Sequence, residues 1–171
     1  MDLQGVITGR VWRLGDHVNT DLLHPPSYFS LDQRRVKEGL QAGMERLGTD
    51  LQRHHTGDGL VIVAGENLGC GSSRETSVRA LCLGGVKVAV ASSFARIFYR
   101  SLANLGIPPL ECRGIQDCVK DGDLIRISIK EGFIEVDDAR RFPVSPLDHH
   151  IERILACGGL VPYLRRKLDE L

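Results

Sequence analysis

Apolar residues cluster in short runs along the first two thirds of the chain, and segments rich in helix-forming residues separate these runs. The run at 60–64 is continuous, the run at 86–91 is interrupted only by Lys87, and both are rich in β-branched residues and short enough to be buried strands. Weaker signals predict further strands over 5–14 and 107–110, and helices over 32–47, 74–83 and 93–102. Strand, helix and strand thus alternate, which is typical of βαβ units with a parallel sheet.

The last third of the chain has a different pattern. Apolar and polar residues alternate at 124–129 and again at 133–136, and the Lys-Glu-Gly between them can turn, so a β-hairpin is predicted. Two helices are expected after it, over 146–156 and 161–168. The fold class is therefore mixed α/β with an antiparallel component. Since no linker-like stretch divides the chain, residues 1–171 are expected to form a single domain.

Small and hydroxyl-bearing residues gather at 68–77, Leu-Gly-Cys-Gly-Ser-Ser-Arg-Glu-Thr-Ser, between a predicted strand and a predicted helix. The first N–H groups of a helix have no partner within it, so an anion can bind there, and Gly69 and Gly71 would leave it room. No Lys-Ser or Lys-Thr follows, which excludes a P-loop, and Arg74 stands where a dinucleotide fingerprint needs glycine. The Ser-x-x-Glu spacing that begins at Ser72 also fits a capping box, so capping and catalysis both remain open on local spacing.

Charge is balanced over the whole chain. Lys plus Arg and Asp plus Glu number 22 each, so no net field attracts nucleic acid or an anionic membrane, and neither partner is expected. The N-terminal residues lack the basic and apolar regions of a signal peptide, and no apolar stretch approaches the roughly 18 residues of a membrane span. We expect a cytoplasmic protein in which a few placed arginines hold a small acidic substrate.

The five cysteines are odd in number and form no Cys-x-x-Cys pair, which favours reduced thiols over disulfides or cluster ligands. Cys70 lies in the glycine-rich loop, but no histidine stands near it in a nucleophile signature, so a structural role is favoured. The histidine pairs at 54–55 and 149–150 suggest metal binding. Adjacent side chains diverge on strands and helices alike, so these pairs are interpreted as solvated. The chain alone is expected to bind no metal.

Four segments, in a fixed order, carry a resemblance to a known family. They are the Thr-Asp-containing loop 15–25, the Gly-x-Gly-Ser-Ser-Arg-Glu loop 69–75, Ala-Ser-Ser-Phe-Ala-Arg-Ile-Phe-Tyr-Arg at 91–100 and Asn-Leu-Gly-Ile-Pro-Pro-Leu at 104–110. Together they resemble the small subunits of aconitase-superfamily isomerases, and most of all that of 3-isopropylmalate dehydratase. The resemblance implies the swivelling β/β/α domain of these enzymes, a mixed sheet with flanking helices that closes over the active site.

The resemblance also implies an activity. A hydro-lyase of this kind removes water from an isopropylmalate-like hydroxydicarboxylate and adds it back on the neighbouring carbon, in leucine biosynthesis. The family's [4Fe-4S] cluster is held by a separate large subunit, so a heterodimer or heterotetramer is expected and the isolated chain should be inactive. Self-association of the small subunit stays open.

Carried over position by position, the resemblance makes Ser72 the catalytic base and assigns a substrate carboxylate to Ser73 and Arg74. A serine alkoxide needs stabilisation, which a helix N-terminus and a guanidinium supply. Arginine can also grip a carboxylate with two hydrogen bonds. Asp21 would orient a catalytic histidine or the Ser-Arg loop, although an Asx turn before Pro25 explains it equally well.

A second group of residues is assigned to substrate choice. Tyr28, Phe29 and Ser30 align with the family segment that contacts the variable substituent of the substrate. Homoaconitase-like members tend to place arginine at the Ser30 position and isopropylmalate-type members an apolar residue, and serine is neither. Arg96 and Arg100 share one face of a predicted helix and are expected to brace the loop or bind the partner.

Two further departures from the family pattern affect the prediction. Thr76 stands where the family has histidine, and Ser101 where it has asparagine. The alternatives are therefore a small subunit of homoaconitase or of a citramalate- or dimethylmalate-type dehydratase, and a non-catalytic anion-binding module.

Overall fold

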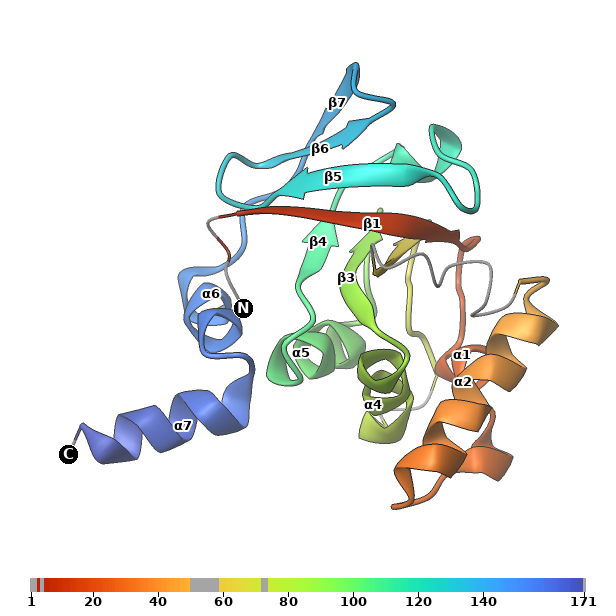
Figure 1. Cartoon of the computed structure of the whole chain (residues 1–171), viewed down its shortest axis with the longest axis vertical. Coiled ribbons are helices and arrows are strands. Elements are labelled where there is room, and N and C mark those ends of the chain that lie inside the picture. Colours follow the sequence, from red (N-terminus) through yellow and green to blue (C-terminus); the bar gives the residue numbers. More distant parts are fainter. Residues whose placement is uncertain (1–2, 4, 50–58, 72–73, 171) are drawn as a thin grey trace.

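The computed structural model describes residues 3, 5–49, 59–71 and 74–170. Within these residues one seven-stranded sheet has the order β4-β3-β2-β1-β5-β6-β7. Figure 1 shows β1 crossing the middle of the molecule, with β5 to β7 on one side and α4 and α5 on the other. The mixed sheet with flanking helices that the sequence predicted is confirmed. None of the described helices is long and apolar enough to span a membrane.

The first half of the sheet is parallel. It comprises four strands, β1 (Val6–Arg13), β2 (Leu60–Ala64), β3 (Val86–Ala91) and β4 (Pro109–Glu111). Helices α4 (Glu75–Leu83) and α5 (Arg96–Asn104) provide the crossovers from β2 to β3 and from β3 to β4. All five residues of β2 are buried, as expected for a parallel strand covered on both faces.

The second half is antiparallel and begins on the other edge of β1. Strands β5 (Leu124–Ser128) and β6 (Phe133–Val136) form the predicted hairpin, and β7 (Arg140–Pro143) extends it. The sequence analysis missed β7 because its Arg-Arg-Phe-Pro lacks an apolar alternation. Its register is set by the hairpin, and both arginines are exposed, which suits the edge of a sheet.

The remaining helices surround the parallel half. Helix α2 (Gln33–Arg46) begins at the cap Asp32, and α1 (Thr20–Leu23) and the 3₁₀ turns η1 (Pro26–Tyr28) and η2 (Ile115–Asp117) are short. The terminal helices are α6 (His149–Ala156), capped by Asp148, and α7 (Leu160–Asp169).

Helix α5 starts three residues later than predicted. Leu68 donates its N–H to the carbonyl of Ser93, and Phe94 forms a parallel bridge with Leu68. Ser93 therefore belongs to a loop, because it pairs with the neighbouring loop instead of continuing as a helix.

Two apolar cores lie on the two faces of the parallel strands. Trp12, Ile62 and Ala89 face the core that helices α2, α4 and α5 cover. Their neighbours Val11 and Val61 face a second core, which they share with the apolar side chains of β5 and β6. Since side chains of both halves of the sheet meet in this second core, the antiparallel half curls over the parallel half.

Candidate functional site

Three loops meet beyond the carboxyl ends of β1, β2 and β3. Gly69 donates its backbone N–H to the carbonyl of Val18 at 2.9 Å, and Thr20 donates to the carbonyl of Cys70 at 3.0 Å. On the other side, Ala95 donates to the carbonyl of Leu68 at 2.9 Å. The glycine-rich loop is thus held between the other two. This is the edge where open α/β sheets bind ligands.

Glycine is required at 69 and 71 for a reason other than the one the sequence suggested. Both residues have left-handed backbone, with φ of +80° and +94°. A Cβ at Gly71 would lie 2.5 Å from the side-chain oxygen and nitrogen of Asn19, and a Cβ at Gly69 would collide with the ring of Phe98. The glycines therefore allow close packing of Asn19 and Phe98 and leave no room for an anion at these two points.

Arg74 marks the start of α4. It is the N-cap residue with extended backbone (φ −81°, ψ 124°), and no side chain caps this helix. A capping box that begins at Ser72 would make Glu75 the third residue of the helix, whereas Glu75 is its first residue here. Ser72 and Ser73 themselves lie outside the described residues.

The guanidinium of Arg74 lies over an aromatic ring. Its central carbon is 4.7 Å from the ring centroid of Phe29, a cation–π contact. Among the described residues Arg74 forms no ion pair, not even with the adjacent Glu75. The structure therefore brings together Arg74 and Phe29, which the resemblance had placed in different parts of the site.

Asn19 takes the capping role that the sequence allowed for Asp21. Its side-chain oxygen accepts the N–H of Asp21 at 2.8 Å, so the Asx turn centres on Asn19 and Asp21 lies in the first turn of α1. The Oδ1 of Asp21 is buried and has no hydrogen-bond partner among the described residues. A buried carboxylate oxygen without a donor is costly, so this one is available to a donor that lies outside the described residues. The sequence analysis missed Asn19, although asparagine before a helix is a recognisable capping signal.

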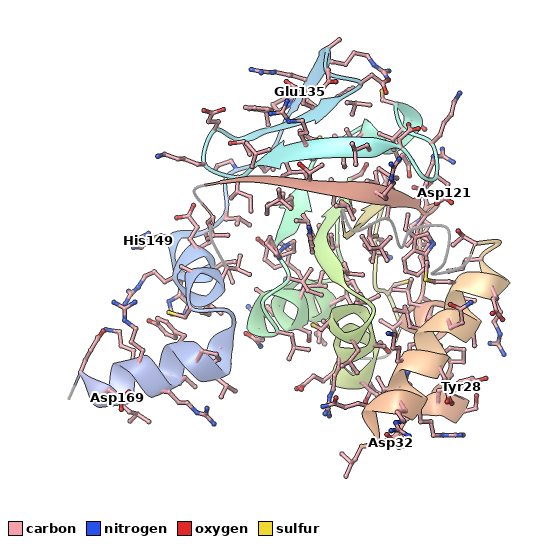
Figure 2. All side chains as sticks on the ribbon, viewed as in Figure 1. Tyr28, Asp32, Asp121, Glu135, His149 and Asp169 are labelled. Carbon is pink, nitrogen blue, oxygen red and sulfur yellow. The ribbon has the colours of Figure 1, made fainter. Side chains whose placement is uncertain are left out.

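The segment 27–32 is anchored to the start of α2 (Figure 2). Arg35 lies over the ring of Tyr28 at 5.5 Å and donates from Nη2 to the carbonyl of Ser27 at 2.7 Å. The hydroxyl of Ser30 accepts the N–H of Asp32 at 3.0 Å. This places the predicted specificity segment beside Arg74 through Phe29, while Ser30 itself supports the turn into α2.

His24 lies behind this segment and was missed by the sequence analysis. It is completely buried, stacks on Phe29 with centroids 5.3 Å apart and planes inclined by 17°, and contacts the carbonyl of Val36 through Nε2 at 3.1 Å. Because a carbonyl can only accept, Nε2 carries the proton. Its Nδ1 is buried without a partner among the described residues, and burial lowers the pKa of His24 below that of a free imidazole.

The thiols and histidine pairs behave as structural or surface groups. Cys70 donates its thiol to the carbonyl of His17 at 3.2 Å, and burial raises the pKa of Cys82 and of Cys112 to about 11. His149 and His150 are exposed at the start of α6, whereas 54–55 lie outside the described residues. In the described ranges no group of three His, Cys, Asp or Glu side chains could hold a metal ion.

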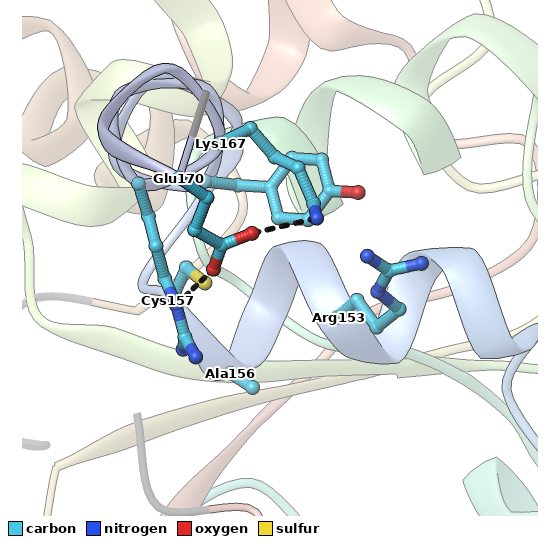
Figure 3. A pocket seen from close by; sticks show the side chains of 7 residues that line it. Arg153, Ala156, Cys157, Lys167 and Glu170 are labelled. Carbon is cyan, nitrogen blue, oxygen red and sulfur yellow. Dashed lines mark hydrogen bonds and ion pairs between the residues drawn. The ribbon is translucent and has the colours of Figure 1, made fainter.

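Cavities lie elsewhere on the molecule. One of about 240 Å³ between α6 and α7 is drawn in Figure 3, where Lys167 and Arg166 both pair with Glu170. A larger one of about 550 Å³ lies between α6 and the β5–β6 turn. Arg96 and Arg100 are exposed on α5.

Comparisons with known proteins find relatives that match along nearly the whole chain. The family model of the aconitase C-terminal domain matches residues 32–114. A 3-isopropylmalate dehydratase small subunit of Methanopyrus kandleri is 38% identical over 167 residues, covering 96% of both chains. A methanogen homoaconitase small subunit of Methanothermobacter thermautotrophicus is 38% identical over 98% of this chain and 95% of its own. The crystal structure of 3-isopropylmalate dehydratase (leuD) of Methanocaldococcus jannaschii superposes with a TM-score of 0.85 at 38% identity, over 97% of this chain and 98% of that one.

Proposed function

Because this chain belongs to the family of 3-isopropylmalate dehydratase small subunits, we propose that it is the small subunit of a two-subunit hydro-lyase that isomerises an isopropylmalate-like hydroxydicarboxylate. The observation that carries this proposal is the similarity over nearly the whole of both chains, which includes the three loops of the candidate site. One sheet shared by both cores also supports the prediction that residues 1–171 form one domain.

Ser72 is proposed as the base that removes the proton from the carbon next to the hydroxyl-bearing carbon. That proton is weakly acidic, so the base must be an alkoxide, and its charge must be offset. The N-terminus of α4 and the guanidinium of Arg74 would both lie close by, because Ser72 is two residues before Arg74.

Arg74, with Ser73, would hold a substrate carboxylate. Two observations support this role for Arg74. Its guanidinium is exposed, and among the described residues it forms no ion pair, so its N–H donors remain available for a bidentate contact.

Asp21 is proposed to accept a hydrogen bond from a donor in the assembled enzyme. Two observations support this: its Oδ1 has no hydrogen-bond partner among the described residues, and the hydrogen bond between Thr20 and Cys70 ties its helix to the glycine-rich loop. Asp21 would then orient the loop that carries Ser72 or a histidine of the partner.

We infer that the ligands of the iron–sulfur cluster come from a partner subunit and not from this chain. The five thiols are unpaired, two of them have raised pKa values, and the described residues offer no cluster of ligands. When bound in a large subunit, a [4Fe-4S] cluster would supply the Lewis acid that polarises the substrate hydroxyl. We therefore propose a cluster-bearing large subunit as partner, in a heterodimer or heterotetramer.

The surface near the loops has the composition of a contact face. Leu22 on α1, Leu31 after the specificity segment and Ile97 on α5 are large apolar side chains that are 44%, 89% and 57% exposed. Leu22 and Ile97 lie on helices that follow two of the three loops, and Leu31 lies two residues after Phe29, so the large subunit is expected to cover them.

The relatives and the residue at position 30 indicate which substituent the substrate carries. The relatives named above include an isopropylmalate dehydratase and a homoaconitase, and another from Methanocaldococcus jannaschii is an isopropylmalate/citramalate isomerase small subunit. Ser30 has no positive charge to meet a further carboxylate, which favours an alkyl-substituted substrate over homoaconitate. Homoaconitase or a citramalate- or dimethylmalate-type dehydratase remains the second candidate.

Substitution of Ser72 in the complex with its large subunit tests the proposal. Ser72→Ala and Ser72→Gly should both preserve assembly and lower kcat by several orders of magnitude, with a much smaller effect on KM. Neither alanine nor glycine supplies an alkoxide, so both variants should be similarly inactive even where their stabilities differ. If Ser72→Gly keeps most of the turnover, Ser72 is not the base. An inactive wild-type complex would favour a non-catalytic module.

A further inference from the structure

The contact between Phe29 and Arg74 suggests a role for Phe29 that the family resemblance does not assign. We propose that Phe29 is a positioning residue, whose ring, itself stacked on the buried His24, holds the Arg74 guanidinium ready for the substrate carboxylate. The inference rests on the proposed function, in that Arg74 is taken to bind this carboxylate.

The guanidinium needs such a support. Arg74 sits at the N-cap of α4 with an exposed side chain, and its one aromatic contact in the described part of the chain is the ring of Phe29, at 4.7 Å. A long side chain without partners samples many rotamers, and the conformational entropy that it loses when it binds a carboxylate weakens the affinity. A ring face attracts a guanidinium without occupying its N–H donors, so the donors stay free to grip a carboxylate.

The ring of Phe29 is itself fixed from behind. It stacks on His24, whose Nε2 donates to the carbonyl of Val36 in α2. Helix α2 can approach this closely because residue 39 is glycine. A Cβ there would lie 2.6 Å from the Cβ of Tyr28 and would also collide with the His24 ring. A rigid helix thus supports the imidazole, the imidazole supports the phenyl ring, and the phenyl ring supports the guanidinium.

This role and the role inferred from the resemblance make different predictions. If Phe29 contacts the variable substituent of the substrate, its loss should change the preference between substrates. If Phe29 positions Arg74, its loss should weaken all substrates alike, because every hydroxydicarboxylate of this class presents the same carboxylate to the same arginine.

The first experiment therefore measures Phe29→Leu and Phe29→Tyr in the complex with the large subunit, on two substrates that differ only in an isopropyl or a methyl substituent. Phe29→Leu should raise KM for both by the same factor, roughly 5- to 30-fold, with little change in kcat. Phe29→Tyr retains the ring and should stay close to the wild type. A change confined to one substrate, or no change in KM, would overturn the proposal.

A double-mutant cycle tests whether the effect passes through the arginine. In the Arg74→Gln background the cation is gone, so Phe29→Leu should add less than about a two-fold further rise in KM. An undiminished effect would mean that Phe29 acts on the substrate directly, and the proposal would be wrong.

A measurement on the isolated chain separates failure of this inference from failure of the proposed function. Ring current from Phe29 should shift the δ-proton NMR signals of Arg74 upfield, and Arg74→Lys assigns these signals by their disappearance. Phe29→Leu should return them to the ordinary position, and Phe29→Tyr should not. If the wild-type signals are unshifted, the inference fails even when the enzyme is active. If they are shifted and the wild-type complex is inactive, the proposed function fails instead.

Discussion

Replacing Gly71 by alanine probes how tightly the glycine-rich loop packs against the loop after β1. Two costs are expected. Alanine is strained at a φ of +94°, by about 1–2 kcal/mol, and its Cβ would lie 2.5 Å from the Asn19 side chain. Asn19 must then move, and because it caps α1, losing this cap costs a further ~0.5–2 kcal/mol. Gly71→Ala should therefore lower the free energy of unfolding by about 1.5–4 kcal/mol.

Gly85→Ala is the matched control. Gly85 has a similar φ of +81°, but a Cβ there meets no atom within 4 Å, so only the backbone cost of about 1–2 kcal/mol should remain. Urea unfolding of the isolated chain measures both variants. In the Asn19→Ala background, Gly71→Ala should cost no more than Gly85→Ala does. If the two glycine variants are equally stable in the wild-type background, the close packing of Asn19 on Gly71 is wrong.

Two further predictions concern the segment behind Arg74. Burial lowers the pKa of His24, so the unfolded chain binds a proton more readily than the folded one, and stability should fall as the pH drops below about 6.5. His24→Gln should flatten urea-unfolding stability between about pH 7 and pH 5 relative to the wild type, and an unchanged slope would contradict this cause. Ser30→Arg in the assembled enzyme should raise kcat/KM for homoaconitate relative to isopropylmalate, because it adds a charge that the native hydroxyl lacks. Ser30→Gln, which has reach without charge, is the control, and an equal ratio in both variants would show that residue 30 does not face the substituent.

The sequence predicted those elements whose cause is local. The apolar runs of β2 and β3 and the helix-forming residues of α2 are read directly from residue order. The start of α5 was misplaced because Ser93 pairs with Leu68, a residue far away in the sequence. Strand β7 was missed because its register comes from β6 and not from its own pattern.

The sequence predicted which residues belong to the candidate site, but it did not predict which of them contact one another. The ordered motifs pointed to Asp21, Phe29 and Arg74, and no spacing rule relates these three segments to one another. That Arg74 meets Phe29, and that Phe29 rests on His24, depends on how α2 and α4 pack. The packing around Gly69 and Gly71 was likewise not predictable from the sequence. Their φ values could be expected from residue type, whereas the side chains that fill the space around them could not.

The position of β1 has a consequence for synthesis of the chain on the ribosome. This strand is made first, yet its register pairs Val6 with Ser128, so one of its edges has no partner until most of the chain has been translated. An open edge can recruit strands of other nascent chains, and such non-local pairing also slows folding. Truncation before Leu124 should therefore yield aggregating chains, even though the three loops of the candidate site would all be present.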